Sequence, residues 1–119
     1  MGSPPAAHDA VRCSAQLVRA FGVLGKRWSG IVLASLEPGP AGFAELTRAI
    51  AGISESVLSD RLAELTAAQL VTRTVRCGPP VGVVYELSPA GHALRPALDA
   101  LARWAQDNLS PERPDPDQP

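Results

Sequence analysis

Apolar residues in the middle of the chain recur at helical spacing in two successive segments. In residues 43–50 they share one face of a helix, and in residues 55–65 the spacing resumes with Leu58, Leu62 and Leu65. The intervening turn contains a glycine and ends at Ser54, whose side chain can cap the second helix. Two short helices joined by about four residues with a glycine are typical of a helix-turn-helix.

The period then changes to that of β-structure. Residues 70–77 and 83–87 are β-rich runs on either side of a Gly/Pro segment, which predicts a hairpin, here called the wing. Ser88 and Pro89 supply a cap and a first-turn proline for a last helix that runs to about residue 108. The pattern predicts a mainly α fold with a small β-hairpin wing: a winged helix-turn-helix with extra N- and C-terminal dimerisation helices.

The remaining segments define the expected domain organisation. Residues 1–12 are small, polar and proline-containing, which predicts a flexible arm, and a helix should begin near Cys13 or Ser14. Residues 26–36 predict another helix, which the prolines after Glu37 end. We therefore expect residues 13–109 to form one domain for DNA binding and dimerisation, and the proline-rich residues 110–119 to form a disordered tail.

The last helix carries an apolar stripe longer than the core of so small a body requires. We expect a second subunit to share this stripe, in a twofold dimer. The alternative is that the N-terminal helix of the same chain covers it. The predicted dimer contacts are Leu17, Phe21, Leu94, Leu98, Leu101, Trp104 and Ala105.

The second helix of the helix-turn-helix has a predicted contact face opposite its leucines, made of Ser56, Ser59, Asp60, Ala63 and Ala67. Small residues permit close approach to base edges, serine can donate or accept, and aspartate can accept from cytosine N4. Ser54 and Val57, at the start of this helix, join the predicted contacts. The alternative is that the serines are only solvated and that Asp60 pairs with a neighbouring arginine.

Basic residues near this face are candidates for phosphate contacts, which position a protein on DNA without specifying sequence. We expect Arg61 on the flank of the helix, Arg76 before the wing tip, and Arg73 either at a phosphate or supporting the sheet. The other candidates are Lys26, Arg27 and Arg48.

Overall charge and composition restrict the function. The formal net charge of −1 gives no general attraction to DNA, and the wing tip, Val81-Gly82, is uncharged. No apolar run approaches the ~20 residues needed to span a membrane, and no secretory signal is recognisable, so a cytoplasmic protein without membrane contact is expected. Two cysteines and two histidines fit no metal site, and no catalytic motif is present, so we expect no enzyme, cofactor or metal.

Several motifs together resemble the HxlR-type winged-helix regulators, which are related to the MarR group. The resemblance implies a bacterial homodimer held by the N- and C-terminal helices, bound to a pseudo-palindromic operator. It rests on Cys13, Leu24-Gly-Lys-Arg-Trp28, Gly42-Phe-Ala-Glu-Leu46, Ile53-Ser-Glu-Ser-Val-Leu-Ser-Asp-Arg-Leu62, Leu70-Val-Thr-Arg73, Val84-Tyr-Glu-Leu87 and Leu94-Arg-Pro-Ala-Leu98.

Two forms of control are compatible with this sequence. The resemblance places Cys13 where some members of the family use a thiol switch, and a helix start lowers a thiol pKa; the alternative is a small buried residue. A small-molecule effector could bind among Phe21, Trp28 and Trp104, although core and interface packing also accounts for these rings. A winged helix that binds protein instead of DNA is the remaining alternative for the whole chain.

Overall fold

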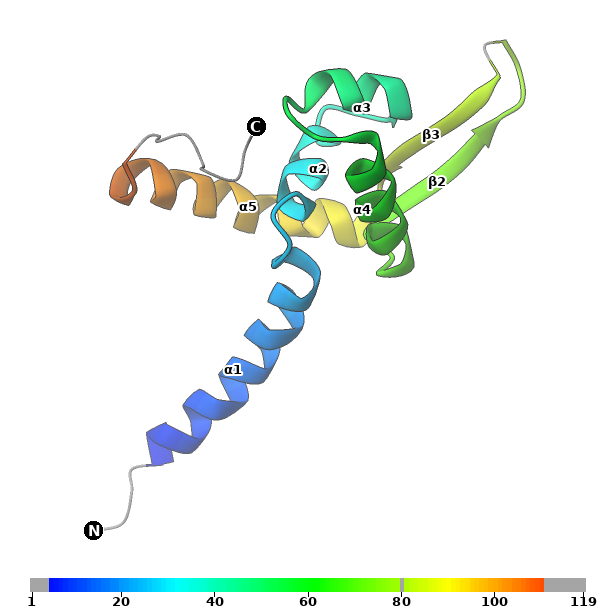
Figure 1. The fold of residues 1–119 in the computed structure, drawn as a ribbon. Helices are drawn as coiled ribbons and strands as arrows, with labels where there is room; N and C mark the ends of the chain where they lie inside the picture. Colours follow the sequence, from blue (N-terminus) through cyan, green and yellow to red (C-terminus); the bar gives the residue numbers. More distant parts are fainter. Residues whose placement is uncertain (1–4, 80, 111–119) are drawn as a thin grey trace.

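The computed structural model describes the backbone of residues 5–79 and 81–110, and the side chains of residues 15–79 and 81–110. The helices α1 and α5 project in different directions from a body that holds the remaining elements (Figure 1). In chain order the elements are α1 (Pro5–Leu24), α2 (Ser29–Ser35), β1 (Ala41–Gly42), α3 (Phe43–Ala49), α4 (Glu55–Ala67), β2 (Val71–Arg76), β3 (Gly82–Leu87) and α5 (Pro89–Asn108). The predicted mainly α fold with a hairpin wing is confirmed.

The helix-turn-helix forms where the apolar spacing predicts it. Between α3 and α4 the chain reverses at Gly52, whose φ of 86° lies in the left-handed region that glycine tolerates. The Ser54 hydroxyl accepts a hydrogen bond from the Val57 backbone N–H at 3.1 Å, which satisfies one of the unpaired amides of the first turn. The predicted cap of α4 is therefore confirmed.

The C-terminal end of α4 is closed by backbone hydrogen bonds. Gln69 adopts a φ of 65°, so the chain leaves the helix in a left-handed conformation. The Leu70 N–H donates to the Leu65 carbonyl at 3.0 Å, and the Gln69 N–H donates to the Thr66 carbonyl at 3.0 Å. This pair of bonds is a Schellman motif, and it directs the chain into β2 beside the helix.

A short third strand joins the predicted hairpin. The sheet has the order β1-β3-β2 and is antiparallel throughout, with Tyr85 paired to Arg73 on one side and to Ala41 on the other. We did not predict β1, because Ala41 and Gly42 carry no β-favouring side chain and pair only once the hairpin is in place. This strand attaches the start of α3 to the wing.

The core lies between α2, α3, α4 and the root of the wing, and α5 begins against it. The Ser88 hydroxyl accepts a hydrogen bond from the Gly91 N–H at 3.1 Å, as the predicted cap requires. The largest fully buried side chains are Leu33, Leu36, Leu46, Leu58, Leu62, Leu65 and Val32.

The helices before the core begin at other residues than predicted. Helix α1 starts at Pro5, ahead of Cys13, so residues 5–12, which were expected to precede the first helix, are part of it. Proline is favoured in a first turn, and the alanines that follow have the highest helix propensity. Helix α2 starts later than predicted, at Ser29, because residues 26–28 form a turn. Residues 1–4 and most of the predicted tail, residues 111–119, lie outside the described part.

Candidate nucleic-acid interface

The outer face of α4 consists of short side chains. The inner face buries Leu58, Leu62 and Leu65, none of which is more than 2% exposed. The five predicted contact residues on the opposite face, Ser56, Ser59, Asp60, Ala63 and Ala67, are all exposed. Because no long side chain projects from this face, another surface can come close to the helix backbone.

Two other predicted contact residues have structural roles in the first turn of α4. Ser54 is exposed and caps the helix, so its hydroxyl is engaged with the backbone. Val57 is only partly exposed and packs against the core. Whether either residue contacts DNA stays a prediction.

A groove of about 430 Å³ separates α4 from the sheet. Ser59, Ala63 and Ala67 line one side, and the paired residues Arg73 and Tyr85 line the other. Arg73 is exposed and has no ion pair with any described residue. The structure therefore brings this arginine to the edge of the predicted contact face.

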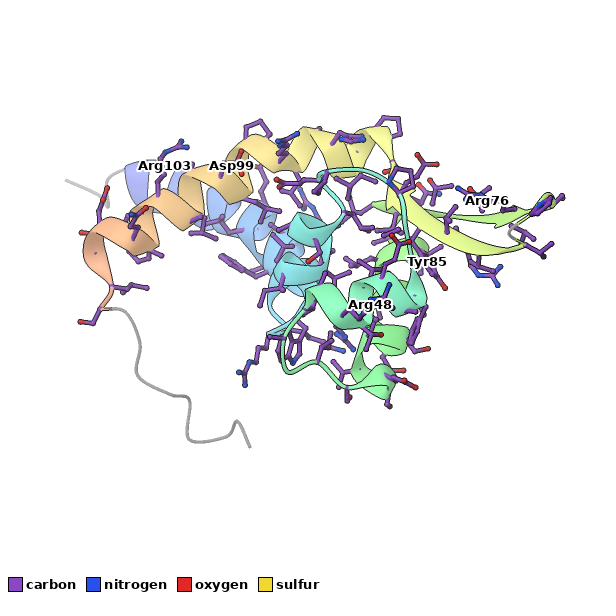
Figure 2. The ribbon with its side chains drawn as sticks, turned by 90° about the horizontal axis from the view of Figure 1, so that it is seen from above. Arg48, Arg76, Tyr85, Asp99 and Arg103 are labelled. Atoms are coloured by element: carbon purple, nitrogen blue, oxygen red, sulfur yellow. The ribbon has the colours of Figure 1, made fainter. Side chains whose placement is uncertain are left out.

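A second groove, of about 560 Å³, lies between α3 and the wing. Arg48 from the last turn of α3 and Arg76 from the end of β2 both line it. Figure 2 shows both arginines on the wing side of the molecule, far from Asp99 and Arg103 on the outer half of α5. Both are exposed, so their guanidinium groups are available to an anionic partner.

Arg61 does not lie on the exposed flank of α4, and that prediction is wrong. It is only 8% exposed, and its guanidinium donates to both carboxylate oxygens of Glu64 at 3.0 Å. Position 61 is adjacent to Leu58 and Leu65 on the helical surface, so the side chain leaves the backbone on the body side. The opposite charges at i and i+3 were the signal in the sequence that could have revealed this pair.

Glu64, which we did not single out, is a meeting point of two predicted phosphate contacts. Lys26 donates a hydrogen bond to its Oε2 at 2.9 Å, from the connection between α1 and α2. This hydrogen bond lowers the pKa of Glu64; desolvation opposes the shift, and the charge of Arg61 adds to it. Arg27, beside Lys26, places its guanidinium 5.1 Å from the centre of the Trp28 ring. Lys26 and Arg61 are therefore engaged within the protein.

Replacing Glu64 with glutamine is expected to lower the free energy of unfolding at neutral pH and to have little effect in strong acid. The folded-state pKa is lowered, so the carboxylate stabilises the fold above its ordinary, unfolded pKa, and this contribution is lost as the pH falls through the lowered value. Urea unfolding of the wild type and the variant across this pH range measures the difference. Glu86→Gln on β3 is the control, and a difference that does not change with pH would contradict the expectation.

The apolar residues of the two projecting helices are exposed. On α1, Leu17 is 58% and Phe21 is 57% exposed; on α5, Leu101 is 52% and Trp104 is 53% exposed. The alternative that α1 covers the stripe of α5 in the same chain is therefore wrong, and the two helices diverge in Figure 1. The other predicted dimer contacts are more buried, since Leu94 and Leu98 pack against the core and Ala105 is half-buried.

The three rings proposed for an effector site have different surroundings. Trp28 packs against the core, whereas Phe21 and Trp104 are exposed on separate helices. An apolar groove of about 330 Å³ lies instead where α1 and α5 leave the body, and it is lined by Ala20, Val23, Leu24, Leu70, Ala90, Ala93 and Leu94. Sequence spacing could not reveal this groove, because its walls come from distant segments.

The described cysteine and histidine side chains form no metal site. Cys13 belongs to α1, but its side chain lies outside the described residues, so the thiol switch stays a prediction. Cys77 is a free, exposed thiol after β2. Within residues 15–79 and 81–110, no group of three His, Cys, Asp or Glu side chains could hold a metal ion. Among the described helices, none has the length and apolar character needed to cross a membrane.

Relatives of this chain are named as transcriptional regulators. It is 39% identical over 92 residues to the HTH-type transcriptional regulator YodB of Bacillus subtilis (strain 168). The aligned residues cover 77% of this chain and 82% of that protein. It is 36% identical over 93 residues to the uncharacterized HTH-type transcriptional regulator YvaP of the same organism, covering 78% of this chain and 86% of that protein. Both names describe transcriptional regulators, and neither names an enzyme.

The fold comparison leads to the same group. The reduced form of YodB from B. subtilis superimposes with a TM-score of 0.73 at 37% identity, covering 82% of this chain and 96% of that one. The redox regulator HypR in its reduced form superimposes with a TM-score of 0.72 at 29% identity. The match covers 78% of this chain and 92% of that one. The HxlR-like helix-turn-helix family matches residues 23–113, which include α4 and the wing. With its helix-turn-helix and wing built as described, this chain belongs to the HxlR-like helix-turn-helix family of DNA-binding transcriptional regulators.

Proposed function

We propose that the protein binds a pseudo-palindromic operator as a homodimer, with α4 of each subunit in a major groove. The outer face of α4 carries this proposal, because Ser56, Ser59, Asp60, Ala63 and Ala67 are exposed and short. A major groove is wide enough for a helix, and short side chains let the helix backbone approach the base edges. The sequence of the operator is therefore recognised mainly by this face.

The exposed arginines beside α4 supply the phosphate contacts in this arrangement. Arg73 borders the groove along α4, and Arg48 and Arg76 border the groove between α3 and the wing. None of the three has an ion pair with a described residue, so binding a phosphate breaks no such pair. Lys26 and Arg61 are left out of this set, since both are engaged by Glu64.

A second copy of the chain covers the projecting helices. Leu17, Phe21, Leu101 and Trp104 leave large apolar surfaces in water in the single chain, and their burial is favourable by about 25 cal/mol for each Å². A twofold arrangement of two such subunits would place the two α4 helices on half-sites about 34 Å apart, one turn of DNA. The proposed dimer thus accounts for the exposed helices and implies a symmetric operator.

Titration of a duplex from upstream of the gene tests the proposal. Binding is expected to weaken steeply with salt, and Arg73→Ala or Arg76→Ala should each reduce the slope of log K against log salt by about 0.9 per subunit, because each removes one phosphate contact. The control is Arg103→Ala, which removes another exposed arginine, from the outer half of α5 (Figure 2).

A protein-binding winged helix is the second candidate, and the formal net charge of −1 favours it. Such a module would bind the duplex weakly, and Arg73→Ala would change the affinity for the duplex no more than Arg103→Ala does. Either result would contradict operator binding by this face.

Control by thiol oxidation belongs to the same proposal. Cys13 lies in α1, one of the two helices assigned to the dimer, and the relative HypR is described as a redox regulator. A peroxide would oxidise the Cys13 thiol to a sulfenic acid with release of water, and this change would alter the spacing of the two α4 helices. The titration is therefore repeated with an oxidant, which should change the affinity of the wild type and of Cys77→Ser but not that of Cys13→Ser.

A further inference from the structure

Asp60 is an exposed carboxylate without a described partner at the centre of the outer face of α4. Three other carboxylates of the body have partners: Glu45 accepts from the Gly42 N–H at 2.9 Å, Glu64 holds Lys26 and Arg61, and Glu37 lies 3.4 Å from Arg95. Asp60 has no hydrogen bond or ion pair with any residue in 15–79 or 81–110. The sequence-based alternative that Asp60 pairs with a neighbouring arginine is therefore not realised among these residues.

The charge of Asp60 also has no compensation within its own helix. Arg61 is the only basic residue of α4, and Glu64 holds it on the body side, where it is 8% exposed. The outer face is left with hydroxyl and methyl groups around one carboxylate, from Ser56, Ala63 and Ala67. This face presents a negative charge and hydrogen-bond acceptors to whatever lies against it.

A carboxylate on this face restricts the DNA chemistry that it can meet. Ionised aspartate accepts hydrogen bonds and donates none, and it repels the phosphates at the edges of the groove. In the major groove only the amino groups of cytosine and adenine donate. Adenine presents the N7 acceptor next to its amino group, which suits an amide side chain and repels a carboxylate. Cytosine N4 is therefore the favoured partner.

We propose that Asp60 determines part of the operator sequence, by accepting a hydrogen bond from the N4 amino group of one cytosine in each half-site. The proposal rests on the proposed function, since it requires α4 to lie in the major groove. It goes further by assigning a base to a residue. The short neighbours Ser56 and Ala63 support the proposal. The aspartate side chain is short, so its carboxylate reaches a base edge only when the helix backbone lies close to the DNA.

The test selects duplexes from a random pool with the wild type and with Asp60→Asn. Wild-type protein should select a cytosine at one position of each half-site. Asparagine both donates and accepts, so the variant should lose that cytosine preference by at least about fivefold and gain preference for adenine there. Asp107→Asn, which removes the same charge from the outer end of α5, should select the wild-type sequence.

A modified cytosine tests the proposed hydrogen bond directly. N4-methylcytosine keeps the Watson–Crick pair but replaces the amino hydrogen in the major groove by a methyl group. At the selected position, N4-methylcytosine should weaken wild-type binding at least about fivefold, and it should weaken the binding of Asp60→Asn by a smaller factor. Wild-type binding that N4-methylation leaves unchanged would overturn the proposal.

The outcomes separate this inference from the function on which it rests. If both proteins select the same operator, and the variant binds all duplexes more tightly by one common factor, Asp60 only repels phosphate and the inference is wrong while operator binding stands. If the wild type selects no sequence at all, the proposed function itself is wrong.

Discussion

Leu101→Glu is expected to give a folded monomer that binds the operator at least about 100-fold more weakly than the wild type, because two linked DNA contacts become one. Leu101 is 52% exposed in the single chain, so a glutamate there remains in water and the core is not disturbed. In the proposed dimer the same carboxylate would be buried against the apolar face of the partner, where an unpaired charge is very unfavourable. Analytical ultracentrifugation and operator titration measure the two effects.

The matched control is Val75→Glu, which introduces the same charge on β2. Val75 is 58% exposed and lies in the wing, away from α1 and α5. This variant should sediment as the wild type does, whatever its affinity for DNA. A wild-type protein that sediments as a single chain, or a Leu101→Glu variant that remains dimeric, would contradict the assignment of α1 and α5 to the dimer.

Gly91→Ala is expected to lower the free energy of unfolding by about 1–3 kcal/mol, the range found for extra methyl groups in packed sites. A Cβ at this position would collide with the carbonyl oxygen of Leu70 and would lie 3.2 Å from Leu87 Cδ2. The Leu70 carbonyl also accepts a hydrogen bond from the Ser88 N–H at 3.0 Å, so α5 cannot move away from Leu70 without losing this bond. Urea unfolding at one protein concentration measures the change.

Gly22→Ala is the opposite control for the same substitution. An added Cβ at Gly22 has no atom within 4 Å, and the residue lies inside α1. Alanine should therefore stabilise the helix by about 0.5–1 kcal/mol. The close approach of α5 to the end of α4 would be in doubt if Gly91→Ala were as stable as Gly22→Ala.

The candidate interface could be predicted from the sequence only in part. The leucine spacing of α4 placed Ser56, Ser59 and Asp60 on the exposed face, and the structure agrees. We predicted Arg61 on the flank, but position 61 lies on the body side of the helix, next to Leu58 and Leu65, and its guanidinium pairs with Glu64. Periodicity assigns a face to each position and says nothing about the partner that a long, flexible side chain finds.

Local signals in the sequence determined which segments are helical and which form the wing. Apolar spacing, the serine caps of α4 and α5 and the Gly/Pro hairpin act between residues a few positions apart, so they can be recognised without the fold. Only the tertiary structure decided the added strand β1, the hydrogen bond of Lys26 to Glu64 across 38 positions, and the exposure of the projecting helices. Each of these depends on contacts between distant segments, which exist only after the chain has folded.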